Sequence, residues 1–314
     1  MKTLITGGSG FIGANLAERL LIDGQEVVCL DNFYSSSSRN IENLKKFEKF
    51  SFVEHDIINP LPAALGKFDE IYHLACPASP PRYQKDHIYT LRVNFEGTLN
   101  VLNFAKENGW PKFLFSSTSE VYGNPLESPQ KESYFGNVNP NGLRSCYDEG
   151  KRVAESLVFN FWREYKFPLK VVRIFNTYGP KMDPYDGRVV SNFIVQALKG
   201  ENLTIYGDGK QTRSFQYIDD LVAGMIKYMA FNEDFPGPIN LGNPNEITVL
   251  ELAEIVAGSF GDLKLEFLPL PSDDPMRRCP DISLAKEKLN WEPIFDLKDG
   301  LIKTIEYFKT CDLN

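Results

Sequence analysis

The sequence starts with an apolar segment, Lys2–Thr6, that runs directly into a glycine-rich turn and then into an amphipathic segment over Ala14–Leu21. Gly7, Gly10 and Gly13 fall in a GxxGxxG pattern between the two. Glycine is required there because the backbone must approach a pyrophosphate closely and the helix must pack tightly on the strand. The N-terminus of the helix then offers amide groups and a partial positive charge to the phosphates. We therefore predict a dinucleotide-binding strand–turn–helix unit, with a tight turn that binds nothing as the alternative.

An acidic residue follows the second predicted strand, Glu26–Leu30, which ends in Asp31-Asn32. In dinucleotide-binding folds a carboxylate at this place binds the ribose hydroxyls of the adenosine. A carboxylate would also repel a 2′-phosphate, so the sequence favours NAD over NADP as the cofactor. A turn aspartate without a ligand is the alternative interpretation.

The alternation of strands and helices continues along the chain. Further strands are expected at 52–56, 69–74, 113–116, 170–175 and 203–206, and helices at 88–106, 189–198, 219–229, 249–257 and 283–289. This pattern predicts an α/β fold, a Rossmann-type doubly wound parallel sheet with right-handed crossovers. We expect residues 1–178, with sheet-completing segments from about 214–242, to form the NAD-binding domain, and residues 179–314 to form mostly a smaller, discontinuous C-terminal substrate-binding lobe.

Two reactive side chains lie on the helix expected after the fifth strand, since Tyr147 and Lys151 are four residues apart and so share one helical face. Thr118, Ser119 and Glu120 follow that strand directly. A lysine ammonium beside a phenol favours the phenolate and lowers the phenol pKa from about 10. Such a tyrosine can accept the proton of a sugar hydroxyl while hydride leaves the same carbon. A surface tyrosine with a solvated lysine is the alternative for this spacing.

Composition argues against several other classes of function. The 314 residues carry a net charge of −8, which disfavours binding to nucleic acid or to an anionic membrane. Five cysteines lack CxxC spacing and three histidines lack metal-ligand spacing, so we predict reduced thiols and no metal site. No apolar run reaches the roughly 18 residues that span a bilayer, and the early glycines do not fit a signal peptide. We expect a soluble protein of the cytoplasm.

The fourth predicted strand leads into a proline-rich segment, Ala75–Pro81, that contains Pro77, Pro80 and Pro81. Three prolines cannot continue a helix, so we expect this loop to be extended. Ligands of open α/β sheets bind beside the loops at the carboxyl ends of the strands. The segment is therefore a candidate wall of the site.

Longer stretches carry a family resemblance over nearly the whole chain. They are HLACPASPPRYQ (73–84), SEVYGNPLESPQKESYFGNVNPNGLRSCYDEGKRVAES (119–156), RIFNTYGPKMDPYDGRVVSNFIVQAL (173–198) and TIYGDGKQTRSF (204–215). With them the chain resembles the extended short-chain dehydrogenase/reductase family that acts on nucleotide sugars, and within it the UDP-glucuronate decarboxylases. GxxGxxG and YxxxK are shared by the entire superfamily, whereas ACPASPP, SCYDEGKR and RRxPDI are more specific.

The pair Ser119-Glu120 discriminates between activities within this family. The related 4,6-dehydratases carry Asp-Glu there, because they must protonate a departing C6 hydroxyl, and 4-epimerases generally lack the glutamate. A 6-carboxylate substrate has no hydroxyl to expel and would be repelled by an aspartate, so the pair points to decarboxylation. With Arg278, the pair would manage the carboxylate and the reprotonation of C5, although Glu120 as a structural cap is the alternative. Cys279, where decarboxylases usually have lysine, and the loop 34–38 depart from the family pattern.

The resemblance implies that NAD oxidises C4 of UDP-glucuronate, that CO2 leaves, and that C4 is reduced again to give UDP-xylose. The catalytic residues it implies are Thr118, Ser119, Glu120, Tyr147, Lys151 and Arg278. The implied cofactor contacts are Gly7, Gly10, Phe11, Ile12, Gly13, Asp31, Asn32, Asp56, Ile57, Leu74, Ala75, Asn94, Ser116, Tyr147, Lys151 and Phe175. The implied nucleotide-sugar contacts are Ser79, Pro80, Arg82, Tyr83, Asn176, Val190, Phe193, Tyr206, Gln211, Arg213 and Arg277.

Some alternatives stay open at this point. A 4-epimerase or 4,6-dehydratase on the same scaffold, a UDP-apiose/xylose synthase, and a non-catalytic NAD(H)-binding regulator would share most of these residues. The adjacent Arg277 and Arg278 suit a diphosphate, because the guanidinium fork bonds two oxygens, but an exposed pair is also compatible with the sequence. The resemblance further implies a homodimer joined through a four-helix bundle of the 88–106 and 145–165 helices, with neither nucleic acid nor membrane as a partner.

Overall fold

The computed structural model describes residues 1–261, 263–269 and 277–313. Its centre is a seven-stranded sheet in the order β11-β6-β5-β4-β1-β2-β3, in which all neighbouring strands are parallel. The strands are β1 (Lys2–Thr6), β2 (Glu26–Asp31), β3 (Phe50–Glu54), β4 (Glu70–His73), β5 (Lys112–Thr118), β6 (Leu169–Ile174) and β11 (Ile239–Leu241). The predicted doubly wound parallel sheet is confirmed.

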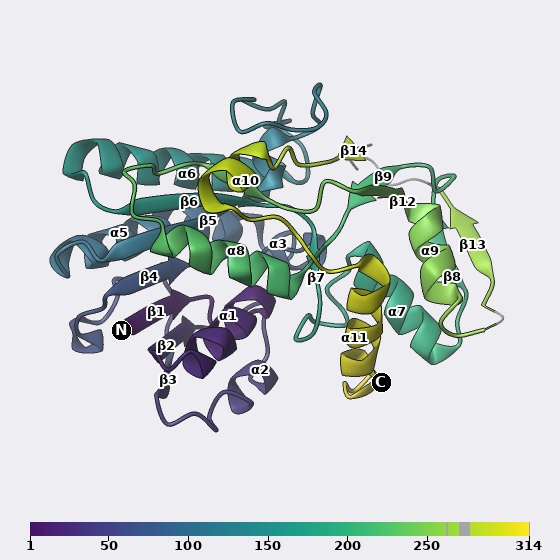
Figure 1. The fold of residues 1–314 in the computed structure, drawn as a ribbon, viewed down its shortest axis with the longest axis horizontal. Helices are drawn as coiled ribbons and strands as arrows, with labels where there is room; N and C mark the ends of the chain where they lie inside the picture. The colour runs from purple at the N-terminus through teal and green to yellow at the C-terminus, as the bar shows by residue number, and fades with distance from the viewer. Residues whose placement is uncertain (262, 270–276, 314) are drawn as a thin grey trace.

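Helices cover both faces of this sheet (Figure 1). α1 (Phe11–Ile22) packs against α8 (Ile218–Ala230) on one face, and α5 (Thr98–Glu107) packs against α6 (Ser145–Tyr165) on the other. Such sheets are built from strands that are apolar on both sides, which explains the near-continuous apolar runs in the sequence.

The alternation of side chains along β5 shows how one strand contributes to two cores. Leu114 is buried in the same core as Leu16 of α1 and Leu221 of α8. Its neighbours Phe113 and Phe115 point to the opposite face and are buried in the second core, which also holds residues of α5 and α6. The end of β5 is thereby fixed from both sides.

The helix predicted over 88–106 is confirmed, but it contains an irregularity that was not predicted. It consists of α4 (His87–Arg92), a π-helical turn (Val93–Gly97) and α5, which follow one another without a gap. Gly97 packs against Ile57, since a Cβ there would lie 2.6 Å from Ile57 Cδ1. A helical periodicity in the sequence does not reveal the wider turn that accompanies this close approach.

Several later elements gather beyond one end of the sheet, at the right of Figure 1. The parallel pair β8 (Leu203–Tyr206) and β13 (Leu265–Leu268) lies with α7 (Val189–Lys199) and α9 (Val249–Ala257). The remaining elements are α2 (Arg39–Glu42), α3 (Pro80–Tyr83), β7 (Thr177–Tyr178), β10 (Gln216–Tyr217), α10 (Ser283–Leu289), α11 (Leu297–Lys309), and 3-10 turns at Ala63–Leu65 and Ser119–Tyr122. The helices predicted after residue 178 are confirmed, whereas α11 was not predicted.

Among the described helices, none has the length and apolar character needed to cross a membrane.

A small three-stranded sheet brings distant arginines together. β9 (Thr212–Ser214) lies between the antiparallel β12 (Glu246–Thr248) and the parallel β14 (Arg277–Arg278). Arg278 is in register with Arg213 in this pairing. Two arginines far apart in sequence therefore lie on neighbouring strands.

The proline-rich segment after β4 differs from its prediction. Pro80 and Pro81 occupy the first positions of the short helix α3 instead of holding an extended loop. Proline is tolerated in the first helical turn because the N–H it lacks would have no partner there.

Candidate active site

A cavity of about 1040 Å³ lies at the carboxyl ends of the strands. Its walls come from the turn after β1, the segment 74–84 after β4, the end of β5, the first turns of α6 and the segment 174–193. The order of the sheet reverses between β1 and β4, and ligands of open α/β sheets bind at this crevice. The topology thus places a ligand site here.

The glycine turn forms one wall of the cavity. Gly7 has a φ of 76°, and a Cβ on it would lie 2.8 Å from Ala75 N in the loop after β4. A Cβ on Gly13 would lie 2.2 Å from Gly7 O, so α1 can approach β1 this closely only with glycine. The N-terminus of α1 faces the same turn. This cradle fits the pyrophosphate of a dinucleotide such as the predicted NAD.

Asp31 ends β2 beside the glycine turn and lines the cavity. Its Oδ2 accepts a hydrogen bond from Ser9 N at 3.1 Å, and its Oδ1 accepts from Phe33 N at 2.9 Å and from Ser36 Oγ at 3.2 Å. The carboxylate therefore fixes the glycine turn relative to the serine-rich loop, and it is the group that would bind the adenosine ribose of NAD.

Tyr147 and Lys151 both line the cavity from the first turns of α6. The Lys151 ammonium donates to Ser116 O at 2.8 Å, and both Tyr147 and Lys151 are buried. The Tyr147 ring stacks on Tyr83 of α3 with centroids 5.0 Å apart. Thr118 lines the same cavity and caps the turn that follows β5. The structure thus brings together groups that the sequence placed on separate elements.

The acidity of Tyr147 differs from the prediction. Burial raises the pKa of Tyr147 above its ordinary value, and a hydrogen bond with Thr118 opposes this only in part. Burial also lowers the pKa of Lys151. The predicted lowering of the tyrosine pKa rested on the attraction between ammonium and phenolate alone, whereas both groups here also lose hydration.

Glu120 carries a carboxylate that two arginines share. Its Oε2 accepts from Arg278 Nη2 at 2.9 Å and from Arg144 Nη2 at 2.5 Å. Arg278 is 2% exposed and also donates to Ser119 O at 2.8 Å. Burial alone would raise the pKa of Glu120, but the charges of Arg278 and Arg144 outweigh it and hold the pKa below its ordinary value. The cavity therefore contains a fixed glutamate anion.

The loop after β4 contacts the segment before α7 next to the cavity. Arg82 and Asp183 form an ion pair at 2.5 Å, and Arg188 donates to Ala78 O at 2.8 Å. All four residues line the cavity. These contacts connect the first part of the chain to the later elements.

Most of the predicted site residues line this one cavity. All six residues predicted as catalytic do so. The cofactor candidates that line it are Gly7, Gly10, Phe11, Ile12, Gly13, Asp31, Asn32, Asp56, Ile57, Leu74, Ala75, Ser116, Tyr147, Lys151 and Phe175. The substrate candidates that line it are Ser79, Pro80, Arg82, Tyr83, Asn176, Val190, Phe193, Tyr206, Gln211 and Arg213.

Two predicted residues lie outside the lining of the cavity. The Arg277 side chain is 59% exposed and forms an ion pair with Glu246 at 2.8 Å, because β14 turns alternate side chains to opposite faces. Asn94 is buried in the π-helical turn, where its amide donates to Thr90 O at 2.9 Å and packs against Gly150 of α6. These positions support neither the predicted substrate contact of Arg277 nor the predicted cofactor contact of Asn94.

Comparison with known proteins agrees with this geometry. The model of the NAD dependent epimerase/dehydratase family matches residues 3–242. The chain belongs to this family. The family also confirms NAD as the predicted cofactor.

Among relatives in this family, UDP-glucuronic acid decarboxylase 1 of Arabidopsis thaliana is 50% identical over 315 residues, covering 100% of this chain and 71% of that protein. UDP-glucuronic acid decarboxylase 1 of Danio rerio is 50% identical over 308 residues, covering 98% and 72%. A solved structure of UDP-glucuronic acid 4-epimerase from Bacillus cereus, in complex with UDP-glucuronic acid and NAD, is 30% identical with a TM-score of 0.89, covering 98% of this chain and 99% of that one.

Within this family fold, several charged residues of the cavity were not predicted from the sequence. Arg144 lies three residues before Tyr147, so its helical spacing was a usable signal. Asp183 and Arg188 also line the cavity but sit in an irregular segment without periodicity. Only the folded chain places them beside the loop after β4.

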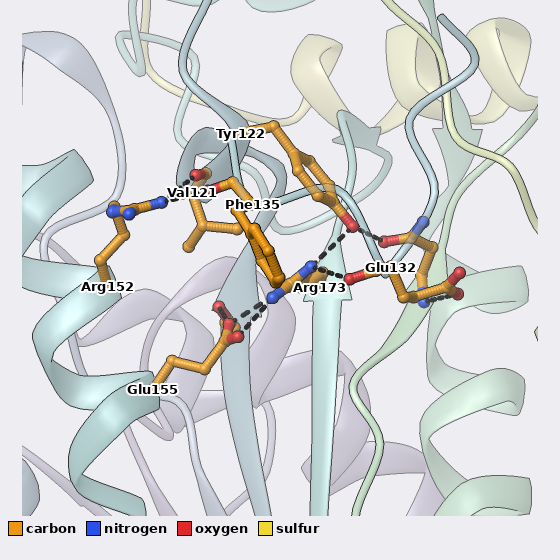
Figure 2. A network of polar contacts seen from close by, with 9 residues as sticks. Val121, Tyr122, Glu132, Phe135, Arg152, Glu155 and Arg173 are labelled. Carbon is orange, nitrogen blue, oxygen red and sulfur yellow. Dashed lines mark hydrogen bonds and ion pairs between the residues drawn. The ribbon is translucent and has the colours of Figure 1, made fainter. Parts of the chain in front are cut away.

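A buried polar network lies behind the end of β5 in this epimerase/dehydratase fold (Figure 2). Arg173 of β6 pairs with Glu155 of α6 at 2.5 Å and donates to Tyr122 Oη and to Glu132 O, both at 3.0 Å. Arg152 of α6 donates to Val121 O in the cavity-lining turn and to Phe135 O in the loop that follows it. These contacts hold the turn and the loop against α6 and β6.

Proposed function

We propose that this protein is an NAD-dependent UDP-glucuronate decarboxylase, a carboxy-lyase that converts UDP-glucuronate to UDP-xylose and CO2. The observation that carries the proposal is 50% identity to UDP-glucuronic acid decarboxylases along essentially the full chain, against 30% to UDP-glucuronic acid 4-epimerase. The cavity supports it, because Ser119 and an arginine-bound Glu120 follow β5 beside Tyr147 and Lys151.

The chain supplies the groups that hold the cofactor. The glycine turn and the N-terminus of α1 receive the pyrophosphate, Asp31 binds the adenosine ribose, and Lys151 binds the nicotinamide ribose. Bound NAD supplies reversible hydride acceptance at C4 of the sugar, so the reaction has no net redox change. The close backbone approach at Gly7 and Gly13 supports the assignment of this turn to the pyrophosphate.

Tyr147 accepts the proton of the C4 hydroxyl, and Thr118 orients that oxygen. Lys151 stabilises the phenolate that forms, which matters because burial alone raises the Tyr147 pKa. The C4 ketone lies β to the 6-carboxylate, so the bond to CO2 can break with its electrons delocalised into an enolate. Tyr147 returns the proton when the C4 hydroxyl forms again.

Ser119, Glu120 and Arg278 act on the carboxylate and on C5. Arg278 is a buried cation at the cavity, suited to an anionic substrate group. The charges of Arg278 and Arg144 keep Glu120 ionised. We therefore assign Glu120 to orienting a solvent water that protonates C5, instead of giving up a proton of its own.

The later part of the chain provides the nucleotide pocket. We assign the UDP diphosphate to Arg213 and the uridine to the residues around Val190, Phe193 and Tyr206, all of which line the cavity. This corresponds to the expected division into an NAD-binding domain over 1–178 and a mainly substrate-binding lobe over 179–314. Truncation variants that retain NAD binding but lose UDP binding would support that division.

We also propose that the protein works as a homodimer in the cytoplasm. Apolar side chains on α4, the π-helical turn and α6 are exposed, namely Ile88, Leu91, Phe95 and Val153. Helix faces of this kind suit the predicted four-helix interface.

The proposed location rests on the cysteines. All five cysteines are free thiols, which suits a reducing compartment. Light scattering of the purified protein tests the homodimer. Fluorescence microscopy of a tagged protein tests the cytoplasmic location.

The function is tested by incubating purified protein with UDP-glucuronate and catalytic NAD, followed by NMR of the sugar. UDP-xylose with CO2 and without stoichiometric NADH is the expected result. UDP-galacturonate would identify a 4-epimerase, and a branched-chain sugar would identify a UDP-apiose/xylose synthase. Unchanged substrate with NAD bound would favour another nucleotide sugar or a regulator.

A further inference from the structure

Arg144 connects two parts of the cavity that the sequence treats separately. Its backbone carbonyl accepts the N–H groups of Tyr147 at 2.9 Å and Asp148 at 3.0 Å, and these bonds start α6. Its guanidinium donates to Glu120 Oε2 at 2.5 Å. One residue therefore holds both the first turn of the tyrosine's helix and the carboxylate that follows β5.

Both arginine contacts of Glu120 are on the same oxygen. Arg278 reaches Oε2 from β14, and Arg144 reaches it from the start of α6. The side chains are mostly buried, with Glu120 17% and Arg144 21% exposed. One donor would restrain Oε2 to an arc, whereas a second donor from another element fixes its position.

We propose that Arg144 is a positioning residue for the reaction, which sets the orientation of Glu120 relative to Tyr147. The inference rests on the proposed decarboxylation and adds a residue that the family resemblance did not imply. Arg278 supplies charge deep in the site, and Arg144 supplies the link to the helix of the catalytic base. The groups that act at C4 and at C5 of the sugar are thereby held in a fixed position relative to each other.

The environment of Glu120 determines what loss of Arg144 does. Within the part of the chain that the structure describes, the charged or titratable groups that face it are Arg144, Arg188, Arg213 and Arg278, together with Tyr83, Tyr147 and Asp148. Asp148 lies behind Arg144, with its Oδ2 3.9 Å from Arg144 Nε. Removing one of the two directly bonded guanidiniums raises the pKa of Glu120, because the remaining cations are farther away or already shared.

The test compares Arg144→Ala with Arg163→Ala in the NAD-loaded enzyme. Arg163 is the control, because it lies near the other end of α6, is exposed outside the cavity lining, and donates to Asn160 Oδ1 at 3.1 Å. Arg144→Ala is expected to lower kcat by about tenfold to a hundredfold with little change in KM. The acidic limb of its pH–rate profile is expected to move to higher pH. Arg163→Ala is expected to do neither.

Arg144→Lys separates positioning from charge and serves if Arg144→Ala does not fold. It keeps the cation but not the planar fork, so kcat falls while the acidic limb of the pH profile stays in place. If Arg144→Lys and Arg144→Ala both keep the wild-type kcat, or if Arg163→Ala shifts the pH profile as much as Arg144→Ala does, the proposal is overturned.

A second readout does not depend on the substrate. Protein labelled with 13C at glutamate carboxyls is titrated by NMR, with the Glu120 signal assigned by its loss in Glu120→Gln. The midpoint for Glu120 is expected to move to higher pH in Arg144→Ala and to stay unchanged in Arg163→Ala. If the enzyme fails to decarboxylate UDP-glucuronate while this shift is seen, the proposed function is wrong and the role of Arg144 stands. An unmoved midpoint contradicts the role of Arg144 itself.

Discussion

Arg173 of β6 and Glu155 of α6 form a buried ion pair, with 2.5 Å between Arg173 Nη2 and Glu155 Oε1 and side chains only 12% and 11% exposed. Ser117 Oγ donates to Glu155 Oε2 at 2.6 Å. Because Ser117 directly precedes Thr118, the pair anchors the end of β5 where the cavity-lining turn begins. The ion pair thus connects the core of the fold to the position of the site.

Glu155→Gln is expected to destabilise the protein, because it leaves the Arg173 guanidinium buried without an opposite charge. The free energy of unfolding is expected to fall by about 3 kcal/mol. Urea denaturation measures this change. The double variant Glu155→Leu with Arg173→Met, which removes both charges, is expected to be more stable than Glu155→Gln. A fall of under about 1 kcal/mol in the single variant would show that the pair does not anchor this region.

The adjacent arginines of β14 are expected to behave differently. Arg277→Ala removes an exposed ion pair with Glu246, which contributes under about 1 kcal/mol to the free energy of unfolding. Because Arg277 also lies outside the cavity lining, activity should change less than about twofold. Arg278→Ala removes a buried cation bonded to Glu120 and Ser119, and kcat should fall by about a hundredfold. Steady-state kinetics on both variants decide this.

Thermal unfolding serves as the control for that comparison, since a buried arginine also contributes to folding. Arg278→Lys keeps the charge and is expected to keep the fold while losing the shared bonds. Equal losses in the Arg277 and Arg278 variants would mean that the exposed side chain binds substrate after all.

The sequence predicted the parts of the structure that follow a local pattern. Helix α7 was expected at 189–198 and is found at Val189–Lys199, because its apolar spacing is regular. The spacing of Tyr147 and Lys151 predicted that they share a helical face, and both line the cavity. Helix α11 also has a helical spacing of buried residues, Leu301, Ile305 and Phe308, and could have been predicted.

Contacts between distant segments could not be predicted in this way. Strand β11 has only 3 residues, too few for a periodic pattern, and is defined by its pairing with β6. The contacts of Glu120 with Arg144 and Arg278 join three elements, and the ion pair of Arg82 with Asp183 joins two irregular segments. Such pairs depend on tertiary packing, as does the burial that raises the Tyr147 pKa.

The cofactor end of the cavity gives a further prediction. Asn40 Nδ2 donates to Ser9 O at 3.0 Å and to Lys181 O at 3.2 Å, so it bridges the glycine turn and the segment before α7. Asn40→Ala leaves both carbonyls without this donor, and the Kd for NAD is expected to rise about tenfold. Calorimetric titration of NAD into cofactor-free protein measures it. Asn108→Ala is the control, because its amide bonds Phe104 O away from the cavity, and an equal rise there would indicate general destabilisation.

Asp148 gives a prediction about the dependence of stability on pH. Burial, followed by the charge of Glu120, raises the pKa of Asp148 from 3.8 to about 7. Its Oδ1 is buried without a hydrogen-bond partner. The folded protein therefore holds this proton more tightly than the unfolded chain. As a result, the free energy of unfolding falls as pH rises from about 4 to about 7 and then stays level.

Asp148→Asn removes this titration while preserving the shape of the side chain. The variant is expected to match the wild type near pH 4 and to be more stable by on the order of 1–2 kcal/mol at pH 8. Urea denaturation at a series of pH values measures the difference. Asp23→Asn is the control, since the Asp23 side chain is 40% exposed and pairs with Arg19 outside the cavity lining. A difference between Asp148→Asn and wild type that is constant with pH would show that Asp148 is already ionised at pH 4 in the folded protein.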